Sequence, residues 1–571
     1  MSEFFIGYEK IAPATWVYLS SLLMLALYFK FSRYWSLRNL DLILLIAVAP
    51  GLLFYHWGSQ LQIDALRQAA TASAVQPGPG PSADSAAGAI GADPASRLDE
   101  GTAEDADEPA SAESATAFEE REDLPGSRRD RGRAALTSPV VPSAVELTNE
   151  PEPVSADGAT LEISVDDDSY ETAVAGPEEE SRRMLGRSRT LLTVAYIWLF
   201  AATAVYFIRL IIDPLMVRRP LLEPNLSPGG LIFLGCSLFV FLMANVVTSP
   251  PSEDDLQGPK LASKLFQREA TEKQEEPLKF GPGLAVVYLL PTLPTYPTEA
   301  ENDPNSPTQS YQAHAVASRI MAILAHLAIV AGLVVIGWRH FNNPTTSVGM
   351  AALYLMLPYT AIMTGRVIHF LPAAMLVWAF VFYRRPMLAG VFLGAAIGTV
   401  YYPLFLLPLW ISFYRQRGWA KFVIGIAISL GTIIFSLIFT SADFEDFVWQ
   451  LRRMFGLWAP QLEGLEGFWD LVLAPAYRIS ALTAFVAISG ALALWPTQKN
   501  LGTLISCSAL LMTAVQFWHG FGGGTYIAWY LPLLILTFFR PNLEDRVAIS
   551  VIRAPRAAAK RVVGADTQMA A

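Results

Sequence analysis

The stretch that decides the fold runs from Arg366 to Trp419 and reads RVIHFLPAAMLVWAFVFYRRPMLAGVFLGAAIGTVYYPLFLLPLWISFYRQRGW. It holds two apolar runs, and basic residues follow each of them: the pair Arg384–Arg385 after the first, and Arg415 and Arg417 after the second. Basic flanks mark the cytoplasmic side of a membrane segment. Both ends of the second run, Met387–Tyr414, are therefore predicted to lie in the cytoplasm, whereas a single span would separate them.

The second run predicts a helical hairpin. Its 28 residues exceed the roughly 20 that one span requires. Pro403 and Pro408 interrupt it, and each proline removes a helical hydrogen bond. We expect two short arms that bend near Tyr401, Tyr402 and Pro403; the alternative is one long helix kinked at its prolines. Because irregular backbone at membrane depth survives only against protein or a watery cavity, a hairpin implies a cavity.

The whole chain predicts an all-α, polytopic transmembrane bundle with about 11–13 membrane segments. It has 571 residues, 53% of them hydrophobic, and a mean hydropathy of +0.36. Its net charge of −10 comes from one region: Asp64–Arg187 holds 27 acidic and 10 basic residues, and the remainder 24 acidic and 31 basic. That region is rich in Ala, Ser, Pro and Gly, so it cannot bury enough apolar surface to fold.

Four regions follow from these patterns. Residues 1–63 are expected to form two N-terminal spans, and residues 64–187 a disordered acidic insert. Residues 188–541 are the transmembrane core, and residues 542–571 a basic cytoplasmic tail.

Counting spans back from a cytoplasmic tail places three segments together on the outer side: Ser249–Gln312, Ser441–Ala476 and Trp518–Thr525. The acidic insert falls on that side as well. Within the first segment, the apolar patch Gly281–Pro294 is too short to span, so it is expected to be interfacial or re-entrant. The Gly-rich GFGGG, Gly520–Gly524, is expected to be a tight turn.

Three acids stand just beyond the fourth predicted span, which runs from about Gly229 to Thr248. These are Glu253, Asp254 and Asp255. Such a cluster is either a solvated loop end or a source of a general base or a metal ligand. The chain has no P-loop, no G-x-S-x-G and no HExxH motif, and its two cysteines lie in apolar runs. No cofactor is identified, and a divalent metal is left open.

Other ionisable residues gather at the outer ends of spans. Such residues are functional candidates by default, although side chains near helix ends can instead extend to the interface. Arginine suits a phosphate because its planar fork donates two hydrogen bonds at once. An interfacial aromatic belt explains most of the aromatic residues on the same side, which are Trp449, Trp458, Trp469, Trp518, Trp529 and Tyr530. With two tyrosines at the bend, the candidate substrate-binding set is His314, Arg319, Arg366, His369, Tyr401, Tyr402, Arg478 and His519.

The run Ser318–His369, SRIMAILAHLAIVAGLVVIGWRHFNNPTTSVGMAALYLMLPYTAIMTGRVIH, resembles the GT-C superfamily of integral membrane glycosyltransferases. That family often shows an Arg-led span, a short basic cytoplasmic turn and an Ala-rich span that ends near Leu-x-Pro. The following RRPMLAGVFLGAAIGTVYYPLFLLPLW is similar to the family's RRP helix pair. Where relatives often carry Lys before the aromatic-Pro, this chain has Val400, Tyr401 and Tyr402. The resemblance covers roughly Gly229–Pro541.

The resemblance implies a bundle of GT-C type and a lipid-linked sugar donor, commonly a polyprenyl-phosphate sugar. It also implies a general base among the acids of the first large outer loop, which here are Glu253, Asp254 and Asp255. We favour Asp254 and Asp255, with Asp255 slightly ahead. The expected activity is sugar transfer at the outer face of the plasma (inner) membrane, with the donor and membrane lipids as partners and no nucleic acid.

Two other classes of function remain open at this point. Broken helices also mark transporter sites, so a transporter or lipid flippase is the main alternative. We find no internal repeat, however, and most ionisable residues lie at span ends. A non-catalytic scaffold that uses the acidic insert as a tether is the third possibility.

Overall fold

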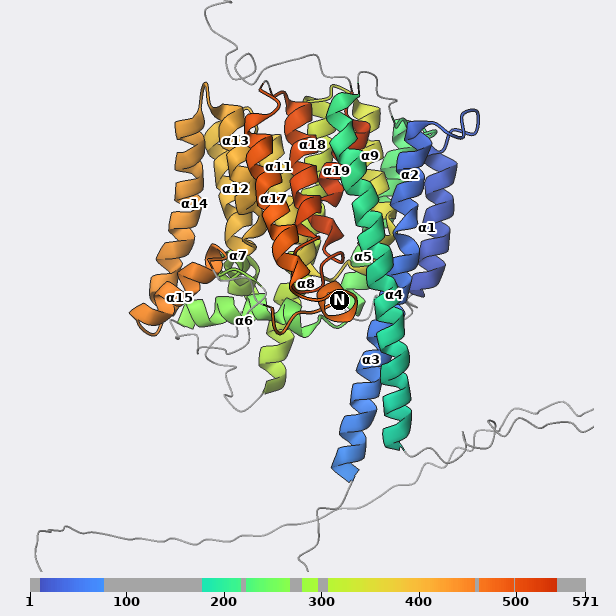
Figure 1. Ribbon diagram of the computed structural model, residues 1–571, viewed down its shortest axis with the longest axis vertical. Helices are drawn as coiled ribbons and strands as arrows, with labels where there is room; N and C mark the ends of the chain where they lie inside the picture. Colours follow the sequence, from blue (N-terminus) through green and yellow to red (C-terminus); the bar gives the residue numbers. More distant parts are fainter. Residues whose placement is uncertain are drawn as a thin grey trace, which may run out of the picture. The chain divides into compact units, whose positions relative to one another are not determined.

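A computed structural model describes residues 11–75, 177–216, 222–267, 280–295, 307–457, 462–497 and 499–541. Within these ranges the chain is helical and has no β-strand, as the sequence predicts. Figure 1 shows its helices. Their bounds are α1 Pro13–Tyr28, α2 Leu37–Ala47, α3 Ala49–Val75, α4 Pro177–Ile212, α5 Pro228–Thr248, α6 Glu253–Gln267, α7 Gly283–Thr292, α8 Pro307–Arg339, α9 Pro344–Met356, α10 Pro358–Ile362, α11 Val367–Val381, α12 Pro386–Thr399, α13 Leu407–Tyr414, α14 Trp419–Thr440, α15 Phe444–Met454, α16 Phe468–Leu471, α17 Tyr477–Leu494, α18 Leu501–Val515 and α19 Leu531–Phe539, with short 3₁₀ helices η5 Asp213–Leu215, η6 Leu293–Thr295, η8 Tyr402–Leu406 and η9 Ile527–Trp529.

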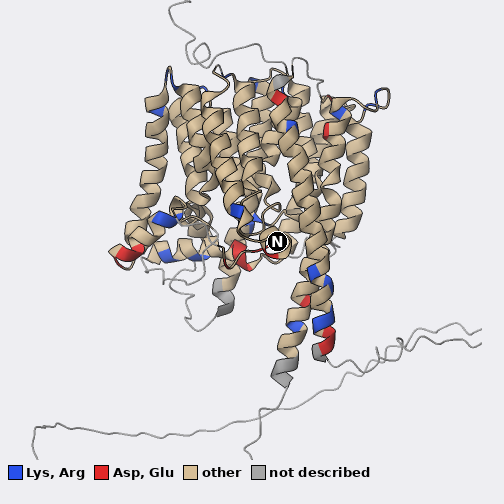
Figure 2. Ribbon diagram, viewed as in Figure 1, with Lys and Arg blue, Asp and Glu red and all other residues tan. Residues whose placement is uncertain are grey.

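The architecture is compatible with a multi-pass membrane protein. Among the described residues, six helices are long and apolar enough to cross a membrane, and six shorter apolar helices of 10–17 residues accompany them. Figure 2 shows Lys, Arg, Asp and Glu near both ends of the bundle, with its middle almost free of them. This distribution suits an apolar layer between two aqueous faces, because a charge in hydrocarbon is costly.

The structure confirms the predicted hairpin. Helix α12 ends at Thr399, the backbone at Val400 is extended, and η8 and α13 follow. The Tyr414 hydroxyl, at the end of α13, donates a hydrogen bond of 2.5 Å to the carbonyl of Tyr383, just before α12 begins. The two arms therefore start and end on the same side of the bundle (Figure 1).

Glycines bring α12 close to its neighbour α14. Gly390 and Gly394 form a G-x-x-x-G pair on α12, and Gly425 faces them from α14. A Cβ at Gly390 would meet the carbonyl oxygen of Phe422, and one at Gly425 would meet that of Met387. Small residues at such crossings let backbones approach closely and gain van der Waals contact without a hydrophobic driving force.

Helix α7 packs against the end of α12, next to the break in the hairpin. The apolar patch Gly281–Pro294, predicted to be interfacial or re-entrant, forms this helix and packs on α12, α14 and α8. The amide of Gly281 donates to the carbonyl of Thr399 at 2.8 Å. A Cβ on Gly283 would collide with the backbone of Gly398. A backbone carbonyl at the end of α12 thus has a donor in place of water.

The edges of the predicted insert are wrong. Helix α3 continues to Val75 and α4 starts at Pro177, so residues 64–75 and 177–187 are helical. The rest of the insert, residues 76–176, lies outside the described residues, as does the tail 542–571. In Figure 1 the two helices extend beyond the end of the bundle where α6 and α15 lie.

Small residues at seven-residue spacing explain these longer helices. On α3 they are Gly58 and Ala65, and on α4 Ser181 and Ser188, with Ala65, Ser181 and Ser188 buried. The Ser188 hydroxyl donates to the carbonyl of Gly58 at 2.8 Å. Composition alone suggested a segment without a core, whereas close helix–helix contact needs only these small side chains.

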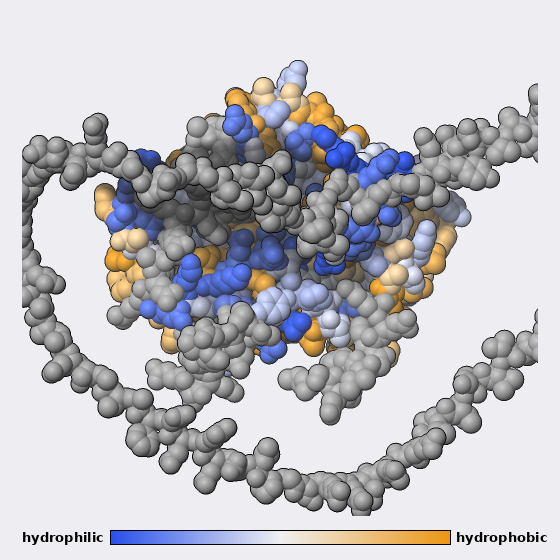
Figure 3. Space-filling view, turned by 90° about the horizontal axis from the view of Figure 1, so that it is seen from below, coloured by the Kyte–Doolittle hydropathy of each residue, from blue (hydrophilic) through white to orange (hydrophobic). Residues whose placement is uncertain are grey.

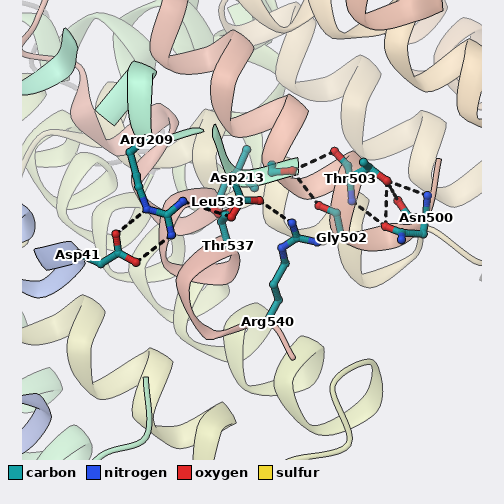
Figure 4. A network of polar contacts seen from close by, with 10 residues as sticks. Asp41, Arg209, Asp213, Asn500, Gly502, Thr503, Leu533, Thr537 and Arg540 are labelled. Atoms are coloured by element: carbon teal, nitrogen blue, oxygen red, sulfur yellow. Dashed lines mark hydrogen bonds and ion pairs between the residues drawn. The ribbon is translucent and has the colours of Figure 1, made fainter. Parts of the chain in front are cut away.

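A buried cluster of four charges joins α2, α4 and the end of α19 at the opposite end of the bundle (Figure 4). Arg209 of α4 binds Asp41 of α2 through two hydrogen bonds of 2.7 and 2.9 Å, and Asp213 at 3.3 Å. Arg540, after α19, donates to Asp213 at 2.5 Å. A side chain at Gly502 would occupy the place of the Arg540 guanidinium. Two acids and two bases offset each other here, so we read the cluster as structural.

Replacing Gly425 tests the α12–α14 contact. Gly425→Ala would push a methyl group into the Met387 carbonyl, and overpacking of this kind typically costs about 1–3 kcal/mol. The matched control is Gly431→Ala on the same helix, where a Cβ has no atom within 4 Å. Thermal unfolding in detergent should show a lower midpoint for Gly425→Ala only. Equal midpoints for the two variants would contradict the close approach.

Candidate functional site

Helix α6 presents the acidic cluster. The segment lies within the predicted outer loop Ser249–Gln312, but Glu253, Asp254 and Asp255 form the first turn of a helix. Acidic side chains are favourable there because the N-terminal end of a helix carries partial positive charge. The same helix turns Asp255 and Leu256 inward and leaves Glu253 exposed.

Asp255 joins α6 to the start of α11. Its Oδ1 accepts the backbone amide of Val367 at 3.0 Å, and its Oδ2 accepts the Ser252 hydroxyl at 2.5 Å. Arg366 donates to that same Ser252 hydroxyl oxygen at 2.6 Å, and its Nη1 lies 3.8 Å from Asp255 Oδ2. Asp255 thus satisfies an otherwise unpaired amide at a helix N-terminus, as a capping residue does.

The two neighbouring carboxylates have different environments. The Asp255 side chain is 2% exposed, and burial raises its pKa from 3.8 to about 6, although the Arg366 guanidinium opposes the shift. The Asp254 side chain is 40% exposed and its Oδ2 lies 3.8 Å from Arg366 Nη1. Of the two, Asp254 is the carboxylate that a substrate can reach without a rearrangement.

The first turn of α11 connects the acids to a series of aromatic rings. Arg366 is the residue just before α11, and His369 lies in the first turn of that helix. The His369 ring stacks on Tyr526, with centroids 4.4 Å apart. Its Nδ1 lies 2.6 Å from the Tyr359 hydroxyl, which donates its only hydrogen to the Thr525 carbonyl. His369 Nδ1 therefore donates to Tyr359, and the Nε2 of the neutral ring is an acceptor.

The series continues to the hairpin break. His519 lies 4.7 Å from Tyr526 and 4.9 Å from Tyr402 between ring centroids, and Tyr402 lies 4.1 Å from Tyr401. We call these five side chains the ring series: His369, Tyr526, His519, Tyr402 and Tyr401. In the ring series, residues from the start of α11, from the connection between α18 and α19 and from the hairpin break lie next to one another.

Arg478 lies at the Tyr401 end of the ring series. It is 7% exposed, and its Nε donates to the carbonyl of Trp518 at 2.7 Å. Its charge acts on both Tyr401 and Tyr402. A side chain at Gly520 would contact the guanidinium, so the Gly-rich segment packs closely over this arginine.

The structure confirms the predicted turn at Gly520–Gly524, and the turn also pairs with a second segment. The amide of Glu466 donates to the Gly520 carbonyl at 2.9 Å, and the amide of Gly522 donates back to the Glu466 carbonyl at 3.1 Å. Gly522 has φ +70° and Gly524 φ +94°, a conformation that glycine adopts without strain. The paired segments hold the loop before α16 beside the ring series.

His314 and Arg319 stand apart from the rest of the predicted set. His314 Nε2 lies 3.1 Å from the Ser263 hydroxyl, and Arg319 donates to the Ser249 carbonyl at 3.2 Å. Both contacts fix α6 and the turn before it to α8. We therefore assign them a positioning role. The structure brings together Asp254, Asp255, Arg366, His369, Tyr401, Tyr402, Arg478 and His519.

The expected aromatic belt is wrong for several of its members. Trp469, Trp518, Trp529 and Tyr530 are 3%, 4%, 1% and 0% exposed, so they do not face lipid. Trp529 packs on Tyr402 at 5.1 Å between centroids and belongs to the wall of the site. Tyr526 and Ser252 belong to the site but were not predicted from the sequence. The position of Tyr526, shortly after the Gly-rich turn, is a signal that could have identified it.

Figure 3 shows the end of the molecule that carries these residues, with hydrophilic residues across much of the visible face and hydrophobic ones toward its rim. Among the described residues, no group of three or more His, Cys, Asp and Glu side chains is arranged to hold a metal ion.

Comparisons of the chain with protein-family models, with curated proteins and with solved structures gave no match. The function is therefore argued from the chemistry of the site.

The raised pKa of Asp255 predicts a pH dependence of stability. Because the folded state binds this proton more tightly than the unfolded state, the contribution is complete below about pH 4 and is lost as the pH rises through 6. The shift corresponds to about 3 kcal/mol. Asp255→Asn mimics the protonated form and should not lose stability over this interval.

The measurement is the unfolding midpoint in detergent between pH 4 and 7. The wild type should fall relative to Asp255→Asn as the pH rises, and the Asp254→Asn control should follow the wild type. Parallel curves for wild type and Asp255→Asn would show that the buried carboxylate does not titrate in this range.

Proposed function

We propose that this chain is a membrane glycosyltransferase of GT-C type, which moves a sugar from a lipid-phosphate donor to an acceptor at the outer face of the plasma membrane. One observation carries the proposal: Arg366 and His369, at the start of α11, connect the Asp254–Asp255 pair to the ring series. A base, a cation for phosphate and an apolar wall are the groups that such a transfer requires.

Asp254 is the proposed general base. An acceptor hydroxyl attacks the sugar carbon bonded to the donor phosphate, and Asp254 takes the hydroxyl proton. The new oxygen–carbon bond forms while the bond from that carbon to the phosphate oxygen breaks, and the lipid phosphate leaves with the electron pair. Asp254 suits this role because it is exposed and its Oδ2 lies 3.8 Å from Arg366 Nη1, beside the proposed phosphate contact.

Asp255 and Arg366 have supporting roles in this proposal. Asp255 has both carboxylate oxygens engaged and is 2% exposed, so it positions Arg366 and α11 and does not contact the acceptor. The Arg366 guanidinium is 42% exposed, which leaves room for a phosphate oxygen. A guanidinium stabilises the negative charge that develops on a leaving phosphate.

The proposal is tested with Asp254→Asn, which keeps the size of the side chain and removes the proton acceptor. Loss of a general base typically lowers turnover about 100- to 10,000-fold. The matched control is Glu253→Gln, the exposed neighbour on the same turn, which should keep wild-type turnover. The assay uses purified full-length protein with polyprenyl-phosphate sugars, and measures release of the lipid phosphate and sugar transfer to the acceptor.

Intact turnover in well-folded Asp254→Asn would exclude this residue as the base. If the wild type transfers no sugar but moves solutes or scrambles lipids in liposomes, the transporter or flippase alternative replaces the proposal. The variant's folding is checked by its unfolding midpoint, which should match the wild type because Asp254 is exposed.

A further inference from the structure

A pocket lies apart from the Asp254–Asp255 pair, at the point where α14 ends and α15 begins. Its volume is about 40 Å³. It is lined by residues of α6, α14 and α15, and by the segment that leads into α7. Most of the lining is apolar, including Leu261, Leu265 and Leu437. Its polar lining residues are Ser436, Thr440, Asp446, Gln450 and Arg453, and Arg453 is the one cation among the described residues that line it.

Arg453 has donor capacity left inside the protein. Its Nη2 donates to the carbonyl of Phe280 at 2.7 Å, and its guanidinium lies over the Trp449 ring at 5.3 Å from the centroid. Its Nε is buried and has no hydrogen-bond partner among the described residues. A buried N–H without an acceptor is costly, and the cost is greater for a charged group. The arrangement therefore favours an acceptor atom that enters the pocket.

The acidic side chain of the pocket already has hydrogen-bond partners in its own part of the chain. Asp446 lies seven residues before Arg453, about 10 Å along α15. Its Oδ2 accepts the amide of Ala442 at 3.1 Å and the Gln450 side chain at 3.0 Å. Asp446 also sits in the first turn of α15, where negative charge is favourable. An anion at the Arg453 end is thus two helical turns from this carboxylate.

The pocket stands at the edge of the apolar layer. Helix α14 is a candidate span whose outward side chains Phe435 and Ile438 are 61% and 59% exposed. Its last turn contributes Leu437 and Thr440 to the pocket. Helix α15 is amphipathic and begins with Phe444, which is 79% exposed. In Figure 1, α15 lies across the end of the bundle beside α14, as an interfacial helix does.

We propose that this pocket binds the phosphate group of a membrane lipid. The Arg453 guanidinium supplies the charge-assisted hydrogen bonds, and the leucines of α6 and α14 contact the adjoining apolar chain. The lipid is a polyprenyl phosphate or an anionic phospholipid of the bilayer, which share this chemistry. The inference does not depend on the proposed sugar transfer, because it rests on Arg453 and the pocket alone.

The test measures lipid binding to purified full-length protein by native mass spectrometry, with polyprenyl phosphate and phosphatidylglycerol supplied separately. Arg453→Gln should weaken binding of the retained lipid about tenfold, since a charged hydrogen bond is lost. Arg452→Gln is the matched control, because Arg452 is exposed and does not line the pocket. Retention of either lipid supports the proposal, and the two arms identify which source is bound.

Three results would overturn the proposal: wild-type binding by Arg453→Gln, equal binding of polyprenol without its phosphate, or displacement of the lipid by millimolar inorganic phosphate. If Arg453→Gln does not fold, Arg453→Lys decides, because it keeps the charge and loses the fork. Lysine should weaken binding severalfold, since one ammonium cannot easily serve both the Phe280 carbonyl and a phosphate. Unchanged binding by this variant would contradict the role of the guanidinium.

Discussion

The attachment of Asp255 to the N-terminus of α11 is the interaction on which the candidate site depends. A single carboxylate accepts the Val367 amide and the Ser252 hydroxyl, and Ser252 in turn accepts a hydrogen bond from Arg366. This arrangement fixes α6 to a helix that is 112 residues further along the chain. This attachment places Asp254 beside Arg366. His369, in the first turn of α11, then links these two residues to the ring series. Without this attachment, Glu253, Asp254 and Asp255 would lie at an ordinary solvated helix N-terminus.

Much of the scaffold could be predicted because its signals are local. Basic pairs on both sides of Met387–Tyr414 and the prolines within it were enough to predict the hairpin, since charge and missing amides act within a few residues. The same reasoning put the acids, Arg366 and His519 on one side of the membrane segments. The patch Gly281–Pro294 is too short to span a membrane, which predicted an interfacial or re-entrant segment. In the structure it forms α7. Its glycines approach the end of α12 and supply an amide to Thr399.

What the sequence did not reveal depends on partners far away in the chain. Arg209 pairs with Asp41, 168 residues before it, and no local pattern in the sequence indicates that partner. The extension of α3 and α4 follows from small residues that matter only when two helices meet, such as Gly58 against Ser188. Trp469, Trp518, Trp529 and Tyr530 resembled interfacial aromatics, although they are buried, because composition carries no information on burial. The choice between Asp254 and Asp255 also required the exposure of each side chain, which adjacent positions cannot distinguish.

The most direct test of the central claim is an experimental structure with a non-transferable lipid-phosphate-sugar analogue bound. We predict that the sugar lies between Asp254 and the ring series, with its phosphate within hydrogen-bonding distance of Arg366. An analogue bound instead at the opposite end, beside Asp41 and Arg209, would contradict the assignment of the site. So would a sugar that lies beyond the reach of both Asp254 and Arg366.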